Sequence, residues 1–163
     1  MILVAAVDEN WGIGKDGAQF VYLKEDLKRF QALTMGKTVI VGRKTLAALP
    51  GGKPLKGRDN LILSADPHFS ADGAKVLPDL PSLLACAPED SVVIGGGMVY
   101  KALLPYCSAA YITKLHAAYP ADTFCPDLDA DPAWVLNEES PPLEENGVTY
   151  HYTTYVRRTF HVR

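Results

Sequence analysis

Continuous apolar runs and stretches with helical spacing alternate along the first two thirds of the chain. The apolar runs lie at residues 2–7, 38–41, 61–63 and 92–94. Runs of this kind are typical of strands that are buried on both faces of a sheet. Apolar residues at helical spacing predict helices between them, at residues 25–34, 44–49, 81–87 and 98–104. The alternation therefore predicts parallel strands joined by crossover helices.

The last third of the chain has a different pattern. Strands are predicted there with little helical pattern between them, at residues 110–115, 133–137 and 148–157. This spacing predicts antiparallel additions at one edge of the sheet. With 163 residues, the chain fits a single domain over residues 1–163. The expected fold is α/β, with a central, mostly parallel mixed sheet of about eight strands, an antiparallel C-terminal edge and about four flanking helices.

Composition narrows the range of partners and compartments. The 16 basic and 19 acidic residues leave no broad basic surface, which argues against a nucleic-acid partner. No segment is apolar enough to span a bilayer, and the amino terminus lacks the pattern of a signal peptide. Cys86, Cys107 and Cys125 are odd in number and far apart, so we expect a cytoplasmic protein. The four histidines are scattered, and we expect no metal site.

Three consecutive glycines follow the last of the apolar runs. Gly95, Gly96 and Gly97 stand between a strand predicted to end at Ile94 and a helix predicted to begin at Met98. Free backbone N–H groups and a helix dipole at this point would suit a pyrophosphate. The usual dinucleotide fingerprint G-x-G-x-x-G is absent, however. A tight turn with close packing would require the same glycines.

A basic cluster follows an earlier predicted strand. Gly42, Arg43, Lys44 and Thr45 lie where that strand ends and a short helix begins. Two cations at the carboxyl end of a parallel strand would favour the additional 2′-phosphate of NADPH over NADH. The alternative is a solvated helix start whose basic residues bind nothing.

The first predicted helix carries a candidate acidic group. Asp26 directly precedes Leu27, and Phe30 and Leu33 continue the apolar stripe, so Asp26 could lie at the edge of the buried face. A carboxylate at the lip of an apolar pocket can have a raised pKa, and it can bind an amidine-like cation through two hydrogen bonds. The alternative is a first-turn acid favoured by the helix dipole, and the pattern alone favours that alternative.

The motifs, taken in order, resemble those of the dihydrofolate reductase family over nearly the whole chain. They are AAVDENWGIG at 5–14, EDLKRF at 25–30, VIVGRKT at 39–45, LKGRDNLILS at 55–64, VVIGGGMVY at 92–100, YIT at 111–113 and DTF at 122–124. The resemblance, closest to the bacterial chromosomal type, implies NADPH-dependent reduction of 7,8-dihydrofolate to 5,6,7,8-tetrahydrofolate. It also implies a monomer that binds no nucleic acid and no membrane.

The resemblance implies a set of site residues. Asp26, with Thr113 as its hydroxyl partner, corresponds to the carboxylate that holds N3 and the 2-amino group of the pterin. Arg58 corresponds to the arginine that pairs with the α-carboxylate of the substrate's glutamate tail. The implied substrate-binding residues also include Val4, Ala5, Ala6, Leu27, Phe30, Leu49, Leu55, Ile94 and Tyr100. The implied cofactor-binding residues are Ala6, Ile13, Gly42, Arg43, Lys44, Thr45, Leu63, Ser64, Gly95, Gly96, Gly97, Met98, Val99, Tyr100 and Thr123.

The family also implies a mechanism. Hydride passes from the nicotinamide C4 to the pterin C6 while N5 gains a proton, which water delivers. Asp26 would orient the pterin and favour its protonated form electrostatically. A Gly-Gly peptide within Gly95 to Gly97 would be cis, and this backbone would lie against the cofactor. The loop at residues 8–22 would act as a lid.

The chain departs from the family pattern near the first helix and near the DTF motif. Phe20 and Val21 replace the frequent pair of proline and an aromatic residue, and Lys24 replaces a frequent proline. Val21 has no hydrogen-bond donor in its side chain, so we expect an altered water network and a changed pH dependence of turnover, with Tyr22 as a candidate substitute. Phe124 lies one position earlier than the corresponding family aromatic.

Two other functions fit the same scaffold. One is a reductase of a ribosylamino-pyrimidine in riboflavin synthesis, which would have little need of Arg58 or of the pair formed by Asp26 and Thr113. The other is a noncatalytic folate- or nucleotide-binding homologue, for which the missing loop aromatic is the main support.

Overall fold

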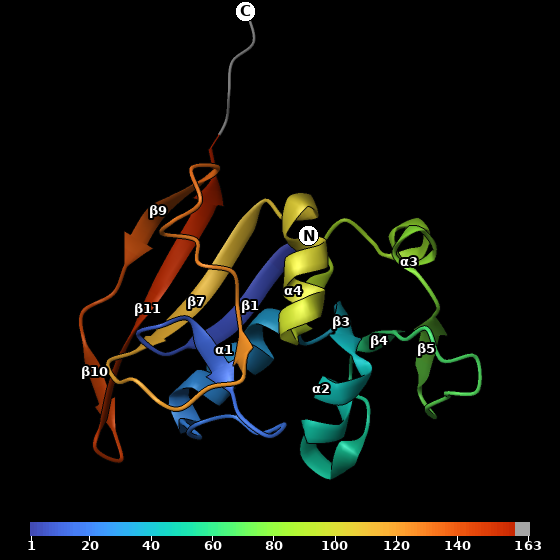
Figure 1. The fold of residues 1–163 in the computed structure, drawn as a ribbon, viewed down its shortest axis with the longest axis horizontal. Helices are drawn as coiled ribbons and strands as arrows, with labels where there is room; N and C mark the ends of the chain where they lie inside the picture. The colour runs from blue at the N-terminus through green and yellow to red at the C-terminus, as the bar shows by residue number, and fades with distance from the viewer. Residues whose placement is uncertain (159–163) are drawn as a thin grey trace, which may run out of the picture.

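The structure, a computed structural model, describes residues 1–158, and the last five residues of the predicted domain, 159–163, lie outside the described range. One mixed sheet of nine strands forms the centre of the molecule (Figure 1). Its strands are β1 (Ile2–Val7), β3 (Thr38–Gly42), β4 (Asp59–Leu63), β5 (Ala74–Leu77), β6 (Val92–Gly95), β7 (Ala109–Leu115), β9 (Trp134–Glu139), β10 (Leu143–Glu145) and β11 (Val148–Arg157). A separate two-stranded sheet pairs β2 (Gly12–Gly14) with β8 (Thr123–Phe124).

Four α-helices flank this sheet. They are α1 (Lys24–Thr34), α2 (Arg43–Ala48), α3 (Leu80–Cys86) and α4 (Gly97–Leu103), with 3₁₀ turns at η1 (Pro50–Gly52) and η2 (Leu104–Tyr106). The predicted helices and the predicted strands of the first two thirds agree with these bounds within two residues. The α/β class and the mostly parallel sheet are therefore confirmed.

The strand order places the central parallel strands side by side. The order is β10-β11-β7-β1-β6-β3-β4-β5. β9 also pairs with β11, at residues 153–157, whereas β10 pairs with residues 148–150. From β7 to β5 every pairing is parallel, whereas β11 runs antiparallel to β7, β9 and β10. The carboxyl ends of six parallel strands consequently lie along one edge of the sheet.

One strand prediction is wrong. The strand predicted at residues 110–115 was expected to be an antiparallel addition, but β7 is parallel to β1, with Leu3 opposite Ala110. The reason is that α4 carries the chain back across the sheet, so β7 starts from the same end as β1. Within residues 1–158, the antiparallel edge consists of β9, β10 and β11.

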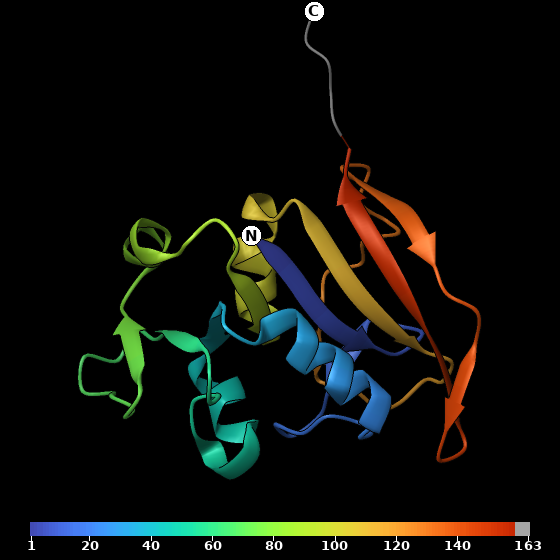
Figure 2. The ribbon, with the colours of Figure 1, turned by 180° about the vertical axis from the view of Figure 1, so that it is seen from behind.

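The two faces of the sheet bury different side chains of β1. Leu3, Ala5 and Val7 belong to a cluster with residues of α3 and α4, whereas Ile2 and Val4 pack on the side of α1 and α2. This alternation follows from the two-residue period of a strand. Figures 1 and 2 show the consequence, with α4 in front of the sheet in one view and α1 in front in the opposite view.

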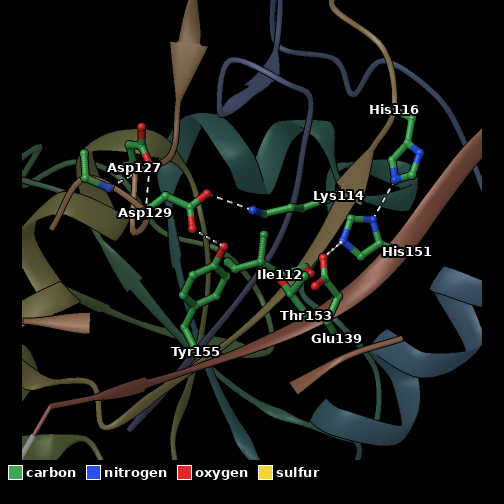
Figure 3. Close-up of polar contacts among 10 residues, drawn as sticks. Ile112, Lys114, His116, Asp127, Asp129, Glu139, His151, Thr153 and Tyr155 are labelled. Atoms are coloured by element: carbon green, nitrogen blue, oxygen red, sulfur yellow. Dashed lines mark hydrogen bonds and ion pairs between the residues drawn. The ribbon is translucent and has the colours of Figure 1, made fainter. Parts of the chain in front are cut away.

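A polar network ties the chain after β8 to the α4 side of the sheet (Figure 3). Lys114 Nζ lies 2.9 Å from Asp129 Oδ2, and the Tyr155 hydroxyl donates to Asp129 Oδ1 at 2.7 Å. Lys114 is next to Thr113 in β7, so the two side chains point to opposite faces. The network therefore supports β7 from the face opposite to Thr113.

Other features expected from composition can be compared with the described residues. Cys86, Cys107 and Cys125 are all free thiols. Within residues 1–158, no helix is long and apolar enough to cross a bilayer, and no cluster of three or more His, Cys, Asp or Glu side chains has the arrangement of a metal site.

Candidate active site

The carboxyl edge of the parallel strands gathers the predicted site residues. Ala6 lies opposite Thr113 in the pairing of β1 with β7, and Val41 lies opposite Gly95 in the pairing of β3 with β6. Residues that are more than 50 positions apart in the sequence therefore meet at one edge. Open parallel sheets bind their ligands at this edge.

Asp26 lies in the first turn of α1 and faces β7. Thr113 Oγ1 donates a 2.6 Å hydrogen bond to Asp26 Oδ1, and the Asp26 side chain is half-buried. Burial is the main cause that raises the pKa of Asp26 above its ordinary value of 3.8. The hydrogen bond from Thr113 and the positive charge of Arg29 lower this pKa, while the negative charge of Glu145 raises it. The carboxyl group thus takes up a proton more readily than an exposed aspartate.

The apolar face of α1 is only partly covered. Leu27 is 43% exposed, Phe30 and Leu33 are half-buried, and Thr34 is the one fully buried residue of the helix. Phe30, Leu49 and Leu55 pack against the same cluster as Val4 and Ile94. Five predicted substrate-binding residues are thereby brought together, and Leu27 leaves apolar surface beside Asp26.

Arg58 is fixed close to the end of α1. Its Nη1 donates to Thr34 Oγ1 at 3.1 Å, and its Nε donates to the Lys56 carbonyl at 2.9 Å. The preceding segment is fastened by Asn60, which accepts from the Leu55 N–H and donates to the Leu55 carbonyl, both at 2.9 Å. Sequence reasoning missed Asn60. Its polar side chain within a buried strand was the available signal.

Two of the three glycines, Gly96 and Gly97, are required by close contacts within the protein, whereas Gly95 has a φ of 129° that favours glycine. The peptide between Gly95 and Gly96 is cis, as the family resemblance implied. A Cβ on Gly96 would lie 2.7 Å from Thr45 Oγ1, and a Cβ on Gly97 would lie 2.7 Å from the Phe124 carbonyl oxygen. The close-packing interpretation therefore accounts for Gly96 and Gly97 without any ligand.

Tyr100 and Val99 hold α4, the helix that follows these glycines, against β1 and β3. The Tyr100 hydroxyl donates to the Val4 carbonyl at 2.7 Å, and burial raises the pKa of Tyr100 well above its ordinary value. Val99 is buried, and its Cγ2 would lie 3.0 Å from a Cβ on Gly42. Met98, by contrast, is 89% exposed. Of these predicted cofactor-binding residues, only Met98 offers a free side-chain surface.

Arg43 already has a partner in the protein. Its Nη1 lies 2.8 Å from Asp66 Oδ2, and its guanidinium lies 4.6 Å from the centre of the Phe69 ring. The Asp66 N–H lies 3.3 Å from Ser64 Oγ. Hydrogen bonds from the His68 N–H and from Arg43 lower the pKa of Asp66. The predicted phosphate-binding residues are thus joined by an acidic residue that sequence reasoning missed.

The segment predicted to be a lid is partly ordered as a strand. Gly12 and Gly14 of β2 are buried and pair with β8, which includes the predicted cofactor residue Thr123. Asp8 accepts from the Gly12 N–H at 2.8 Å and from the Tyr119 N–H at 2.9 Å. The Asp16 N–H donates to Asp122 Oδ2 at 3.0 Å. Buried Asp8 was not identified as an organising residue from the sequence.

Two residues at the departures from the family pattern, Phe20 and Val21, pack against one small apolar cluster. Phe20 stacks on Tyr119 with ring centres 4.8 Å apart, and Val21 packs against a cluster that includes Leu115. Tyr22 is 66% exposed. The effect of Val21 on turnover stays a prediction.

Comparisons with known proteins agree with this arrangement. Residues 1–157 match the family model described as dihydrofolate reductase. The chain is 36% identical to dihydrofolate reductase type 3 of Salmonella typhimurium over 96% of its length and 97% of the relative's. It is 33% identical to dihydrofolate reductase of Bacillus subtilis, over 95% and 93% of the two lengths. The structure of dihydrofolate reductase from Enterococcus faecalis, complexed with NADP(H) and RAB-propyl, superposes with a TM-score of 0.86 at 32% identity, covering 97% of this chain and 96% of that one.

Proposed function

Because this chain belongs to the dihydrofolate reductase family, a family of NADPH-dependent oxidoreductases, we propose that it reduces 7,8-dihydrofolate to 5,6,7,8-tetrahydrofolate with NADPH. The observation that carries the proposal is the 2.6 Å hydrogen bond between Thr113 and Asp26 at the carboxyl edge of the sheet. This bond fixes a carboxylate of raised pKa beside the exposed apolar surface of Leu27. A pterin needs both features, because its flat ring faces pack on apolar surface and its N3 and 2-amino edge carries hydrogen-bond donors.

The cofactor-facing residues have the donors that NADPH requires. Arg43 and Lys44 are exposed cations at the end of β3, and Thr45 and Ser64 offer hydroxyl groups nearby. Arg43 is held by an acidic partner that a phosphate can replace as the anion. These residues would hold the adenosine phosphates, and Gly95 to Gly97 would form the backbone wall next to the nicotinamide. When bound, NADPH supplies the hydride that the pterin C6 accepts.

Asp26 has two tasks in this proposal. Its Oδ1 accepts from Thr113, which leaves lone pairs of the carboxylate for N3 and the 2-amino group of the pterin. Its negative charge favours the protonated form of the pterin, so that N5 gains its proton from water. Tyr100 is unsuited to donate this proton because its buried hydroxyl is already donated to Val4.

The remaining substrate contacts follow from position. Leu27, Phe30, Leu49 and Leu55 would line the p-aminobenzoyl part of the substrate. Arg58, fixed by Thr34 and Lys56, would pair with the α-carboxylate of the glutamate tail. A ribosylamino-pyrimidine lacks that tail and would make no use of Arg58. We also propose that the enzyme acts as a cytoplasmic monomer without nucleic-acid or membrane partners.

The test is NADPH oxidation by the purified protein with and without dihydrofolate. The proposal predicts oxidation that depends on dihydrofolate and is lost in Asp26→Asn. A protein that binds folate and NADPH but shows no such oxidation would instead be the noncatalytic homologue.

A further inference from the structure

A carboxylate from the carboxyl-terminal hairpin reaches the amino end of the helix that carries Asp26. The Lys24 N–H donates to Glu145 Oε2 at 2.6 Å, and the Glu25 N–H lies 3.3 Å from Glu145 Oε1. The residue at the N-cap position, Leu23, makes no side-chain capping hydrogen bond. The first N–H groups of a helix lack partners within the helix, so Glu145 fills the role that an N-cap side chain would otherwise take.

We propose that Glu145 is a positioning residue for Asp26, because it caps α1 through the Lys24 N–H and places a negative charge beside the carboxylate. The inference rests on the proposed function, since it concerns the same site. It assigns a task to a residue 119 positions away from Asp26 in the sequence that has no place in the predicted site.

The contact depends on the residue at position 24. Lys24 is the first residue of α1. Proline fits the first helical position well but has no N–H to donate. The lysine backbone therefore creates a hydrogen-bond donor at the helix start, and the half-buried Glu145 is the acceptor that uses it. A carboxylate at this end of a helix is also favoured by the helix dipole.

The hairpin is built to present Glu145 at this place. Asn146 and Gly147 have φ values of 52° and 76°, which suits the two-residue turn that Asn-Gly prefers. Glu145 pairs with Val148 across the turn, and β11 then pairs Tyr152 with Thr113. Figure 2 shows this hairpin beside α1. One sheet thus provides both the hydroxyl that binds the Asp26 side chain and the carboxylate that binds the backbone of its helix.

The charges around Asp26 make the contribution of Glu145 measurable. Arg29 of α1 lowers the pKa of Asp26 and is itself placed over the Tyr152 ring, 4.1 Å from its centre. Glu145 raises the pKa of Asp26. From β11, Tyr150 and Tyr152 also face this group; burial raises the pKa of both, that of Tyr152 to about 12, so both are neutral at physiological pH. Exposed Glu25 of α1 adds a further negative charge near Tyr150. Removal of the Glu145 charge should therefore lower the pKa of Asp26.

The test separates charge from hydrogen bond. Glu145→Gln removes the Glu145 charge but keeps an oxygen acceptor. Lys24→Pro removes the backbone N–H but keeps the Glu145 charge, and Lys24→Ala, which loses the lysine charge but keeps the N–H, is its control. Glu144→Gln is the matched control for Glu145→Gln on an exposed neighbour. The pKa of Asp26 is measured in the full-length protein by carbon-detected NMR of its carboxyl group, and kcat with dihydrofolate is measured across pH. We expect a lower pKa of Asp26 in Glu145→Gln, an unchanged one in Glu144→Gln, and a severalfold loss of kcat in Lys24→Pro.

The inference is overturned if Glu145→Gln titrates as the unmodified protein does, or if Lys24→Pro keeps the full kcat at every pH. Failure of the proposed function would look different. In that case the unmodified protein would not oxidise NADPH with dihydrofolate, while the NMR titrations would still report whether Glu145 acts on Asp26.

Discussion

Thr113 and Asp26, 87 positions apart in the sequence, are joined by a hydrogen bond of 2.6 Å from the threonine hydroxyl to the carboxylate. Thr113 is 5% exposed and belongs to a parallel strand, so its hydroxyl has little freedom to move. The rigid strand thereby determines the direction in which the carboxylate of α1 faces. Rigid support of this kind is what a site needs to orient a flat substrate.

Thr113→Val should lower the catalytic rate and move the pH profile of activity to higher pH. Valine has a similar shape but cannot donate a hydrogen bond. Because the hydrogen bond from Thr113 lowers the pKa of Asp26, its loss should raise that pKa. We expect kcat/KM for dihydrofolate to fall about tenfold, as for loss of a hydrogen bond to a charged group. Thr113→Ser keeps the hydroxyl and should retain most of the activity. Equal losses in the two variants would show that packing, not the hydroxyl, matters.

Asp66→Asn should strengthen the binding of NADPH. Asp66 shares the guanidinium of Arg43 and carries a negative charge beside the proposed phosphate site. Because both side chains are partly exposed, we expect a modest decrease of KM for NADPH, about two- to fivefold. KM for NADH, which lacks the 2′-phosphate, should change less. Asp72→Asn, an equal charge change at an exposed position, is the control, and a matching decrease there would indicate only a change in net charge.

Gly96→Ala should destabilise the protein through one contact. The added methyl group would lie 2.7 Å from Thr45 Oγ1. Overpacking of this kind costs about 1–3 kcal/mol in free energy of unfolding. Combining the change with Thr45→Ala, which removes the opposing oxygen, should recover part of the loss in thermal unfolding. A double variant that is as unstable as the sum of the single variants would rule out this contact as the cause.

Asp26→Asn should make the protein more stable at neutral pH. Burial raises the pKa of Asp26 above 3.8, so between 3.8 and the raised value the folded state binds more protons than the unfolded state. The stability of the unmodified protein therefore decreases as pH rises through this window, and asparagine removes that decrease. The difference in Tm between Asp26→Asn and the unmodified protein should grow with pH across the window and then level off. A difference that is constant with pH would contradict the raised pKa.

Much of the fold could be predicted because the central strands are buried on both faces. The runs that became β1, β3, β4 and β6 are apolar without interruption, and a pattern of that kind needs no knowledge of partners. The short strand β10 is mostly exposed to solvent and contains no apolar run that would predict a strand. The Asn146-Gly147 turn was the available sign of its hairpin. The direction of β7 depends on the crossover made by α4, which local periodicity does not contain.

The candidate site was less accessible to sequence reasoning. The pattern around Asp26 alone favoured an ordinary first-turn acid, and only the family resemblance pointed to its pairing with Thr113. Asp66 is 23 residues away from Arg43, and Glu145 is 121 residues away from Lys24. These charged contacts arise from tertiary structure, and the sequence around each residue does not indicate its partner.

The most direct measurement is the rate of NADPH oxidation with dihydrofolate for the unmodified protein and for Asp26→Asn, at equal and saturating concentrations. We expect turnover by the unmodified protein and a loss of about a hundredfold or more in the variant, because asparagine removes the negative charge that orients the pterin and favours its protonated form. Asp72→Asn should be as active as the unmodified protein. An Asp26→Asn protein that turns over dihydrofolate at the native rate would show that Asp26 has no part in the reaction.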